Sequence, residues 1–510
     1  MSVAKLNARR KEAGLPLIRF GLRRLSEEDI QDLRDAYAAA YEISEVAVGD
    51  SRGYTAVARG HGYDQDLCHS DDRVFLTWHR AYVYVMERTL NSALKWKRRD
   101  ESLELTLPFW DWTQFDAQTD APNGLPKVVN DATYADSQSV QVSNPLFSAK
   151  SLYRVASQNL QGQEQFTQRF ADRFRDSIDQ LKDDVERYLS NPDYARFSSD
   201  LNFGAHGAIH VRVGGAGPTS PLPGRSGDMA SVVSAAYDPI FWLHHSFIDK
   251  IWFDWQQTHG NSTVPQHVLD SVVYNGFVGR QLLDAERELR YIYSDEEVEA
   301  AEEVGATVPV AVDITAPRGA DPGGNAPPPA AAAPSAAVPA AAHAAPPAAA
   351  PPAAAPPPPP VDLYPILDIG SLKGGFRRAQ LDFHQLHPPK RSFEILAFIN
   401  KPDATENTPC TDPSYAGRLM LFGHGDCHGA RGHCNPRMAE RGDYDLRPDH
   451  PLRFSKTKFQ IDITRGLRRE LANAASLPHP VKITLITVDA EGNAVPQDSV
   501  RYKGVSLSTR

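Results

Sequence analysis

A run of alanine and proline divides this sequence into two parts. From Gly323 to Pro360 the chain contains no Asp, Glu, Lys or Arg, and nearly every residue is Ala or Pro. A segment of this composition cannot build a packed apolar core, so we expect a semi-rigid, polyproline-like linker over residues 311–360. The parts on either side, residues 1–310 and 361–510, are each long enough to form a domain.

The part before the linker has the apolar spacing of helices. Ser26 and Asp29 form a capping-box pattern, and Ile30, Leu33 and Tyr37 then follow at helical intervals. Similar stripes predict two further helices, one with Leu76, Val83, Met86 and Leu90 and one with Phe166, Phe170, Phe174, Ile178, Leu181, Val185 and Leu189. We interpret these stripes as core positions of a helical bundle.

The part after the linker alternates apolar and polar residues with the period of strands. This pattern is clearest in residues 393–395, 459–463 and 481–485, and residues 489–493 have the composition of a turn. The predicted fold is therefore a mainly α, helical-bundle catalytic domain, followed by a Pro/Ala-rich linker and a smaller antiparallel β-sandwich domain.

Charge and hydropathy narrow the classes of partner. The formal net charge is −10, from 54 basic and 64 acidic residues, and the sequence has no long basic run. Both features argue against a nucleic-acid binder. No segment approaches the roughly 18 apolar residues of a membrane span, and no apolar stretch follows the N-terminus, so we expect a cytoplasmic protein that binds no membrane. Four cysteines are too few for a disulfide scaffold. Both a monomer and a homo-oligomer are compatible with this sequence.

The histidines fall into two groups. His61, His69 and His79 lie close together, and His206 and His210 are followed by the pair His244 and His245. Residues four apart share one face of a helix, so His206 and His210 have the spacing of two ligands to one metal. A single buried histidine is most often a core residue, but unpaired imidazoles are costly in surroundings as aromatic as these.

Two groups of three nitrogen ligands predict two metal ions, each with an open position. Imidazole ligands suit both copper and zinc, and the general order of affinities favours copper. A mononuclear zinc hydrolase would leave one histidine group unexplained. A dinuclear zinc hydrolase stays open at this point.

Three segments resemble a known family. Residues 69–80, continuing to Glu87, resemble the first-copper signature of tyrosinases, catechol oxidases and molluscan haemocyanins, and residues 238–245, continuing to Asp249, resemble the second. The segment Pro108–Trp112 resembles a further part of the same family. The resemblance extends from about Arg19 to Gln257 and implies a dinuclear, type 3 copper centre with dioxygen as co-substrate.

The resemblance also implies a role for each residue. It makes His61, His69 and His79 the ligands of one copper, and His206, His210 and His245 those of the other. It favours His245 over His244, because the family ligand precedes the aspartate by four residues. Asp249 should then accept a hydrogen bond that orients a ligand imidazole.

Cys68 is a candidate for a covalent bond to His69. Many eukaryotic members of the family link a nearby cysteine to the second histidine of the first site through a thioether. That cysteine often lies two residues before the histidine, whereas Cys68 is adjacent to it. Adjacent side chains on an extended segment point to opposite faces, which favours a plain buried thiol but leaves the thioether open.

The implied activity is oxidation of small phenolic or catecholic substrates, above all of o-diphenols to o-quinones. In many tyrosinases, an asparagine after the first ligand of the second site and an upstream glutamate orient a water that activates monophenols. Here Gly207 takes the asparagine's place, no matching glutamate is found, and Asn202 is the one substitute. Monophenol hydroxylation is thus in doubt, and o-aminophenol oxidation and haemocyanin-type oxygen carriage are the alternatives.

Trailing β domains of this family commonly cover the copper pocket, and we expect the same of residues 361–510. Within them, residues 415–434 resemble a segment of some relatives that is rich in Gly, His and Cys. Cys427 and Cys434 fit a disulfide, two thiols, or transient copper handling together with nearby histidines. Cys410 has no assigned partner.

Overall fold

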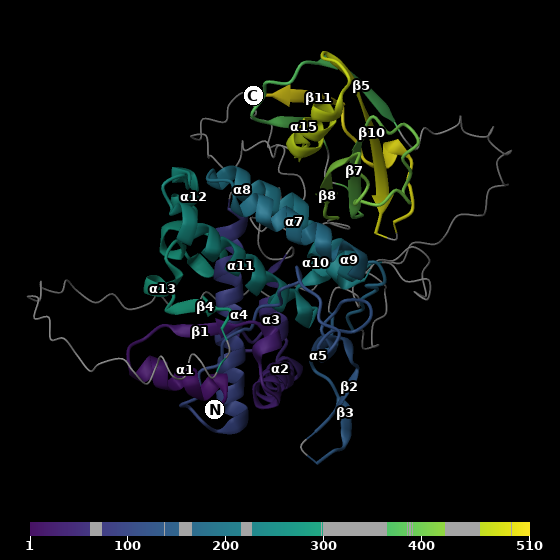
Figure 1. The fold of residues 1–510 in the computed structure, drawn as a ribbon. Helices are drawn as coiled ribbons and strands as arrows, with labels where there is room; N and C mark the ends of the chain where they lie inside the picture. Colours follow the sequence, from purple (N-terminus) through teal and green to yellow (C-terminus); the bar gives the residue numbers. More distant parts are fainter. Residues whose placement is uncertain are drawn as a thin grey trace, which may run out of the picture.

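A computed structural model describes residues 1–61, 74–151, 166–215, 227–298, 365–423 and 459–510, apart from single positions within these ranges. The predicted linker, residues 311–360, lies outside them, so the domain boundaries remain a prediction. Figure 1 shows the helical region in purple to teal and the strand-rich C-terminal region above it in green and yellow. Among the described residues, no helix is both long and apolar enough to cross a membrane.

Helices dominate the N-terminal region, as predicted. The longest are α2 (Glu27–Val46), α4 (Phe75–Arg98) and α11 (Pro239–His259). The other described elements are α1 (Val3–Glu12), α3 (Tyr54–Ala58), α5 (Lys127–Asn130), α7 (Ile178–Leu189), α8 (Tyr194–Leu201), α9 (Gly207–Gly214), α10 (Val232–Ala235), α12 (Gln266–Asp270), α13 (Ala285–Glu288), the short helices η1 (Leu22–Arg24), η3 (Arg175–Ser177), η4 (Asn202–His206), η5 (Asp228–Ala230), η6 (Tyr274–Gly276) and η7 (Gly279–Leu282), and the strands β1 (Leu17–Phe20), β2 (Thr133–Ala135), β3 (Gln141–Ser143) and β4 (Tyr291–Ser294).

Local sequence signals set the ends of these helices. The Ser26 hydroxyl accepts a hydrogen bond from the Asp29 amide, and the Asp29 carboxylate bonds back to the Ser26 amide, which confirms the predicted capping box of α2. The Asp238 carboxylate caps α11, whose first residue is Pro239, and Gly260 ends that helix at a positive φ of 67°. Parallel pairing of β1 with β4 joins the beginning of the helical region to its end.

The predicted helix over residues 166–189 is only partly right, because its first half is not helical. The amide of Thr167 bonds to the carbonyl of Ala149, and Phe170 donates to the carbonyls of Val213 and Gly214. These bonds to distant segments replace the helical ladder. The helix begins at Ile178 instead, where Leu181 and Val185 continue the buried stripe.

The described residues of the C-terminal region form two antiparallel sheets. One has the order β5 (Ile366–Leu372), β10 (His479–Asp489), β7 (Phe393–Ile399), β8 (Tyr415–Leu421), and the other the order β11 (Gly504–Thr509), β6 (Ala379–His384), β9 (Phe459–Asp462). Both contribute to one apolar core, together with the helix α15 (Thr464–Asn473); the short helix η9 (Gln497–Ser499) precedes β11. The three predicted strands are confirmed, while the description as a β-sandwich stays a prediction.

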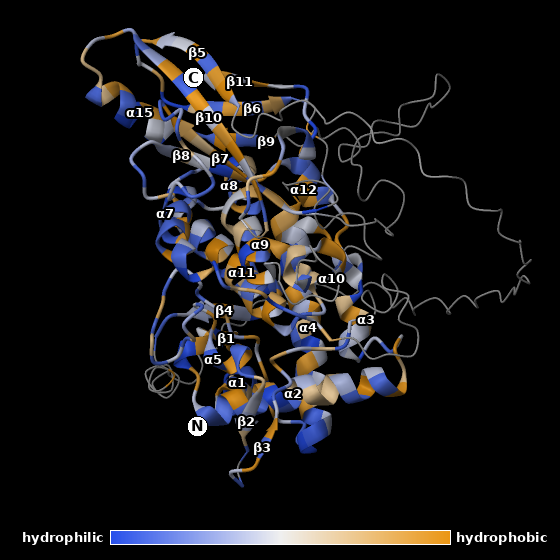
Figure 2. Cartoon of the chain, turned by 90° about the vertical axis from the view of Figure 1, so that its right-hand side faces the viewer, coloured by the Kyte–Doolittle hydropathy of each residue, from blue (hydrophilic) through white to orange (hydrophobic). Residues whose placement is uncertain are grey.

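The two regions meet along α7, α8 and α9. Met420 of β8 is buried within the core of the helical region rather than that of its own sheets. Figure 2 shows apolar colour gathered on α9, α10 and α11 in the middle of the molecule, and polar colour on α7 and α15. The C-terminal region is therefore packed directly against the helices that carry the second histidine group.

Candidate metal centre

Five of the six predicted histidine ligands are described, and all five lie in one buried cluster. His61 follows α3, His79 lies on α4, His206 ends η4, His210 lies on α9 and His245 on α11. None of these side chains is more than 2% exposed. The sixth predicted ligand, His69, and the neighbouring Cys68 lie outside the described residues, so both assignments remain predictions.

A distorted turn brings His206 and His210 together. The segment η4 is one π-helical turn, in which Gly204 has the non-helical angles φ −106° and ψ −105°. A Cβ atom at Gly204 would lie 2.0 Å from the Tyr188 hydroxyl, so no other residue fits there without a shift. Isolated π turns are frequent at functional sites. The two imidazole rings lie with their centroids 4.6 Å apart.

Backbone carbonyls orient four of the imidazoles. The Nδ1 atom of His61 lies 2.7 Å from the Val232 carbonyl oxygen, and that of His210 lies 2.8 Å from the Met229 oxygen. His79 and His206 bond in the same way to the carbonyls four residues before them, at 2.9 and 3.0 Å. A carbonyl oxygen only accepts, so Nδ1 must donate. In a neutral ring, Nε2 is then the unprotonated nitrogen, whose lone pair can bind a metal.

The lone pairs converge within each group. Nε2 of His61 and Nε2 of His79 are 3.4 Å apart, and Nε2 of His210 and Nε2 of His245 are 3.3 Å apart. Two nitrogens bound tetrahedrally to one ion at about 2.0 Å are about 3.3 Å from each other. The rings of His79 and His245 stack at a centroid distance of 4.3 Å, so the two groups face each other.

Burial keeps these imidazoles neutral. Loss of hydration lowers the pKa of His206 to about 3. The same cause, with smaller contributions from neighbouring histidines, holds the pKa values of His79, His210 and His245 well below the ordinary value. Neutral imidazoles are the form that binds metals, and proton competition is weak at physiological pH.

His244 also belongs to the cluster. Its side chain is fully buried, and its ring lies 5.4 Å from that of His206 and 5.0 Å from that of His210. One nitrogen each of His206, His210, His244 and His245 lies within 4.8 Å of the others. Neither nitrogen of His244 has a hydrogen-bond partner in the described part of the chain. The choice of His245 over His244 thus remains a prediction.

The cluster is suited to metal binding, and copper is among the ions that its donors fit. Its donors are all imidazole nitrogens, and the described part of the cluster brings no carboxylate among them. Neutral imidazole sets of this kind suit copper.

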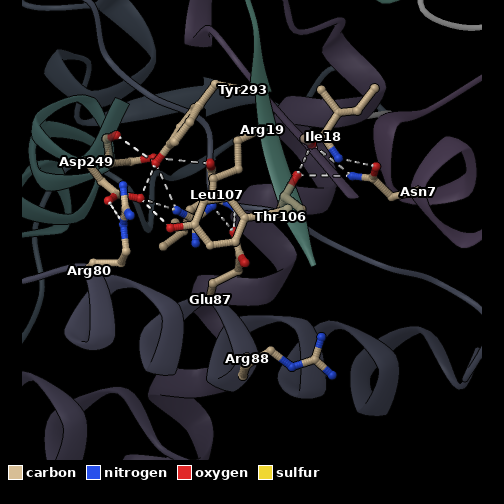
Figure 3. A network of polar contacts seen from close by, with 12 residues as sticks. Asn7, Ile18, Arg19, Arg80, Glu87, Arg88, Thr106, Leu107, Asp249 and Tyr293 are labelled. Carbon is tan, nitrogen blue, oxygen red and sulfur yellow. Dashed lines mark hydrogen bonds and ion pairs between the residues drawn. The ribbon is translucent and has the colours of Figure 1, made fainter. Parts of the chain in front are cut away.

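Asp249 lies at the centre of a buried polar network (Figure 3). Its carboxylate accepts from Arg19 at 3.1 Å, from the Tyr293 hydroxyl at 2.7 Å and from the Tyr291 hydroxyl and the Arg80 guanidinium at 2.5 Å each. Burial alone would raise the pKa of Asp249, but Arg80 and Arg19 outweigh it and hold that pKa below its ordinary value.

The prediction that a ligand imidazole donates a hydrogen bond to Asp249 is wrong for the imidazoles that the structure describes. Four of them use their Nδ1 for backbone carbonyls, and Asp249 is occupied by two guanidinium groups and two hydroxyls. Asp249 acts on the helices instead. Arg80 directly follows His79 on α4, and Asp249 lies one turn after His245 on α11. Their ion pair therefore fixes the two helices beside these histidines.

The C-terminal region covers the second histidine group. The Phe422 ring, just after β8, stacks on His210 with a centroid distance of 4.3 Å and an interplanar angle of 29°. Met420 lies over Gly207, the position predicted to control activity on monophenols. A Cβ atom at Gly207 would lie 2.7 Å from the Met420 Cβ atom. The lack of a side chain at Gly207 thus permits close packing of β8.

Several functional residues were not found from the sequence. Arg80 lies inside the first-copper signature, but nothing in that signature shows its partner. Phe422 lies within the unusual segment 415–434, but nothing in the sequence of that segment shows its contact with His210. Cys427 and Cys434 lie outside the described residues, so their predicted roles are unchanged, and Cys410 forms no disulfide with any described residue.

Comparisons with known proteins agree with this geometry. Residues 50–258 match the family model for the common central domain of tyrosinase, a range that contains all six predicted ligands. The chain thus contains a segment that matches the common central domain of tyrosinase, and it is similar to tyrosinases, polyphenol oxidases and haemocyanins.

Individual relatives include both enzymes and oxygen carriers by name. The chain is 32% identical to Hemocyanin 1 of Megathura crenulata over 256 residues, which is 47% of this chain and 6% of that protein. It is 27% identical to Polyphenol oxidase 3 of Agaricus bisporus over 243 residues, 38% of this chain and 40% of that one. It is 26% identical to the tyrosinase of Streptomyces antibioticus over 199 residues, 37% of this chain and 64% of that one. The matched segments thus span less than two thirds of these relatives.

Solved structures share the fold. A functional unit of octopus haemocyanin has a TM-score of 0.52 at 17% identity, covering 97% of this chain and 100% of its own. A recombinant latent aurone synthase, a polyphenol oxidase, has a TM-score of 0.55 at 16% identity, covering 97% of this chain and 89% of its own. At these identities the likeness concerns the fold alone.

Proposed function

We propose that this protein is a dinuclear copper oxidase that converts o-diphenols to o-quinones with dioxygen. The observation that carries the proposal is the facing pair of neutral histidine groups, with stacked rings of His79 and His245 between them. His61, His79 and the predicted His69 would hold one copper, and His206, His210 and His245 the other. When bound, the copper pair supplies the dioxygen-binding site and accepts the two electrons that each diphenol loses.

The protein's own residues supply orientation and exclusion of water. The carbonyls of Val232 and Met229 hold His61 and His210 in the tautomer whose Nε2 is unprotonated and can bind a metal. Phe241 packs against His61 and His245 at centroid distances of 4.9 and 4.2 Å and helps to keep water away from the rings. Each diphenol releases two protons with its two electrons, and the four electrons from two diphenols reduce one dioxygen to two waters.

Monophenol hydroxylation is a second candidate activity, supported by Asn202. Its side chain is 3% exposed, its Nδ2 has no hydrogen-bond partner among the described residues, and its backbone carbonyl accepts from His206. A buried amide in this position could hold the water that Gly207 cannot. Comparison of Asn202→Ala with the unchanged protein on a monophenol and on a catechol tests this: only the monophenol rate should fall.

Oxygen carriage and o-aminophenol oxidation are the rival functions. The haemocyanins among the relatives favour the former, while the polyphenol oxidase and the tyrosinase among them favour an enzyme. Stopped-flow mixing of the copper-loaded protein with dioxygen, then with a catechol or an o-aminophenol, separates these functions. We expect quinone formation with oxygen consumption. Reversible colour without turnover would instead identify a carrier. If mixing with dioxygen produces no colour, the result would indicate a zinc protein.

A further inference from the structure

A short buried segment lies between the histidine cluster and the C-terminal region. It comprises residues 229–232, which join η5 to α10. Towards the cluster, the Met229 carbonyl accepts from Nδ1 of His210 at 2.8 Å, and the Val232 carbonyl accepts from Nδ1 of His61 at 2.7 Å. One segment therefore orients one imidazole of each histidine group.

The same segment is bound to the C-terminal region on its other side. The Val232 amide donates to the Gly423 carbonyl at 3.1 Å, and the Ala230 carbonyl accepts from the Ser392 hydroxyl at 2.8 Å. The Ser392 hydroxyl also accepts from the Gly423 amide at 2.8 Å. Ser392 thus holds both the segment and the residue to which the segment donates.

Burial makes these bonds consequential. Ser392 is 6% exposed, and Met229, Ala230 and Val232 are at most 2% exposed, so water cannot readily replace a lost partner. Peptide units are planar and rigid, so a tilt that moves the Ala230 carbonyl also moves its neighbours in the chain. Loss of the outer bonds should therefore disturb the Met229 and Val232 carbonyls that orient His210 and His61.

We propose that Ser392 is a positioning residue through which the C-terminal region sets the orientation of His61 and His210. Docking of this region then does more than cover the site, because it also completes the support of one ligand in each group. The inference rests on the proposed copper function for its metal readout. Its first consequence, the coupling between Ser392 and residues 229–232, holds in the copper-free protein as well.

The test compares the full chain with Ser392→Ala, with Ser392→Thr, which keeps a hydroxyl, and with Ser506→Ala, which removes an exposed hydroxyl of the same region, as a control. Ser506 lies on β11 and its hydroxyl bonds to His384, within the C-terminal region. In copper-free protein, hydrogen–deuterium exchange at residues 229–235 should become faster in Ser392→Ala only. Unchanged exchange there overturns the proposal without reference to copper.

The second readout is the metal site. At equal copper content, Ser392→Ala should release Cu(I) to a chelator about threefold to tenfold faster, less than the roughly 10- to 100-fold loss expected for a direct partner of a ligand. Its Cu(II)-loaded form should also show shifted ligand-field bands in visible circular dichroism, and Ser392→Thr should restore both. Faster exchange with unchanged release and bands overturns the positioning role. Failure of the unchanged protein to bind copper contradicts the proposed function instead, and the exchange result then decides the coupling alone.

Discussion

His244 and His245 pose the sharpest question at the scale of single residues. Both are fully buried in one cluster, but only His245 lies 3.3 Å from the His210 Nε2 atom and stacks on His79. We predict that His245→Ala lowers the copper content from two ions per chain to about one, whereas His244→Ala retains two. Metal analysis of the purified variants after copper loading measures this. One copper in His244→Ala, with two in His245→Ala, would reverse the assignment.

The low pKa values of the buried histidines predict an acid-sensitive apoprotein. The pKa of His206 is about 3 in the folded state, far below an ordinary histidine. The unfolded chain therefore binds more protons than the folded one between about pH 6.5 and 3, so stability is fully present above this window and falls as the pH decreases through it. Each such histidine contributes a slope of up to about 1.4 kcal/mol per pH unit.

Denaturant titrations of copper-free protein between pH 7 and 4 measure this effect. His206→Leu removes one titrating group and should make the dependence of the unfolding free energy on pH less steep. If the unfolding free energy depends on pH equally steeply in both proteins, His206 does not contribute to the acid sensitivity as predicted.

At the scale of elements, the Arg80–Asp249 pair is the predicted support of α4 against α11. Asp249→Asn removes a charge that faces two buried guanidinium groups, and leaving such charges uncompensated typically costs about 3–5 kcal/mol. The free energy of unfolding of the copper-free protein should fall by that amount. Asp270→Asn breaks a pair whose side chains are half exposed, so it should cost less than about 1 kcal/mol. Equal losses in the two variants would argue against the role of Asp249.

The elements also show what local sequence determines. The capping box at Ser26 and the spacing of His206 and His210 were predictable because both depend on residues three or four apart. The start of α7 was not, because residues 166–174 bond to distant backbone that no local pattern reveals. Asp249 was recognised as important, but its partners Arg19 and Tyr293 lie 230 and 44 residues away in the sequence. Contacts at that separation depend on the packed fold.

At the scale of the whole molecule, the C-terminal region is held against the helices by buried charges. Arg212 of α9 pairs with Glu394 of β7 at 2.7 Å, and Arg418 of β8 pairs with Asp184 of α7 at 3.2 Å. Burial alone would raise the pKa of Glu394, but Arg212 and Arg418 outweigh it and hold that pKa below its ordinary value. Ion pairs between the helices and the C-terminal strands thus hold the two regions together, and Met420 and Phe422 add apolar contacts between them.

Phe422 is the residue by which this docking should limit activity. Its ring stacks on His210, a predicted ligand of the second copper, so under the proposed function it would stand in the way of an aromatic substrate that approaches this histidine. An aromatic contact of this kind is worth about 0.5–1.5 kcal/mol, so its removal should raise the population of open sites by a factor of about 2 to about 13. We predict that Phe422→Ala oxidises catechol faster than the unchanged full chain by this factor, at equal copper content, in an oxygen-consumption assay. Phe383→Ala, in the core of the C-terminal sheets, is the control for general loosening, which should lower the thermal stability of that variant. If Phe422→Ala is no faster, or Phe383→Ala is faster to the same degree, Phe422 does not obstruct the site.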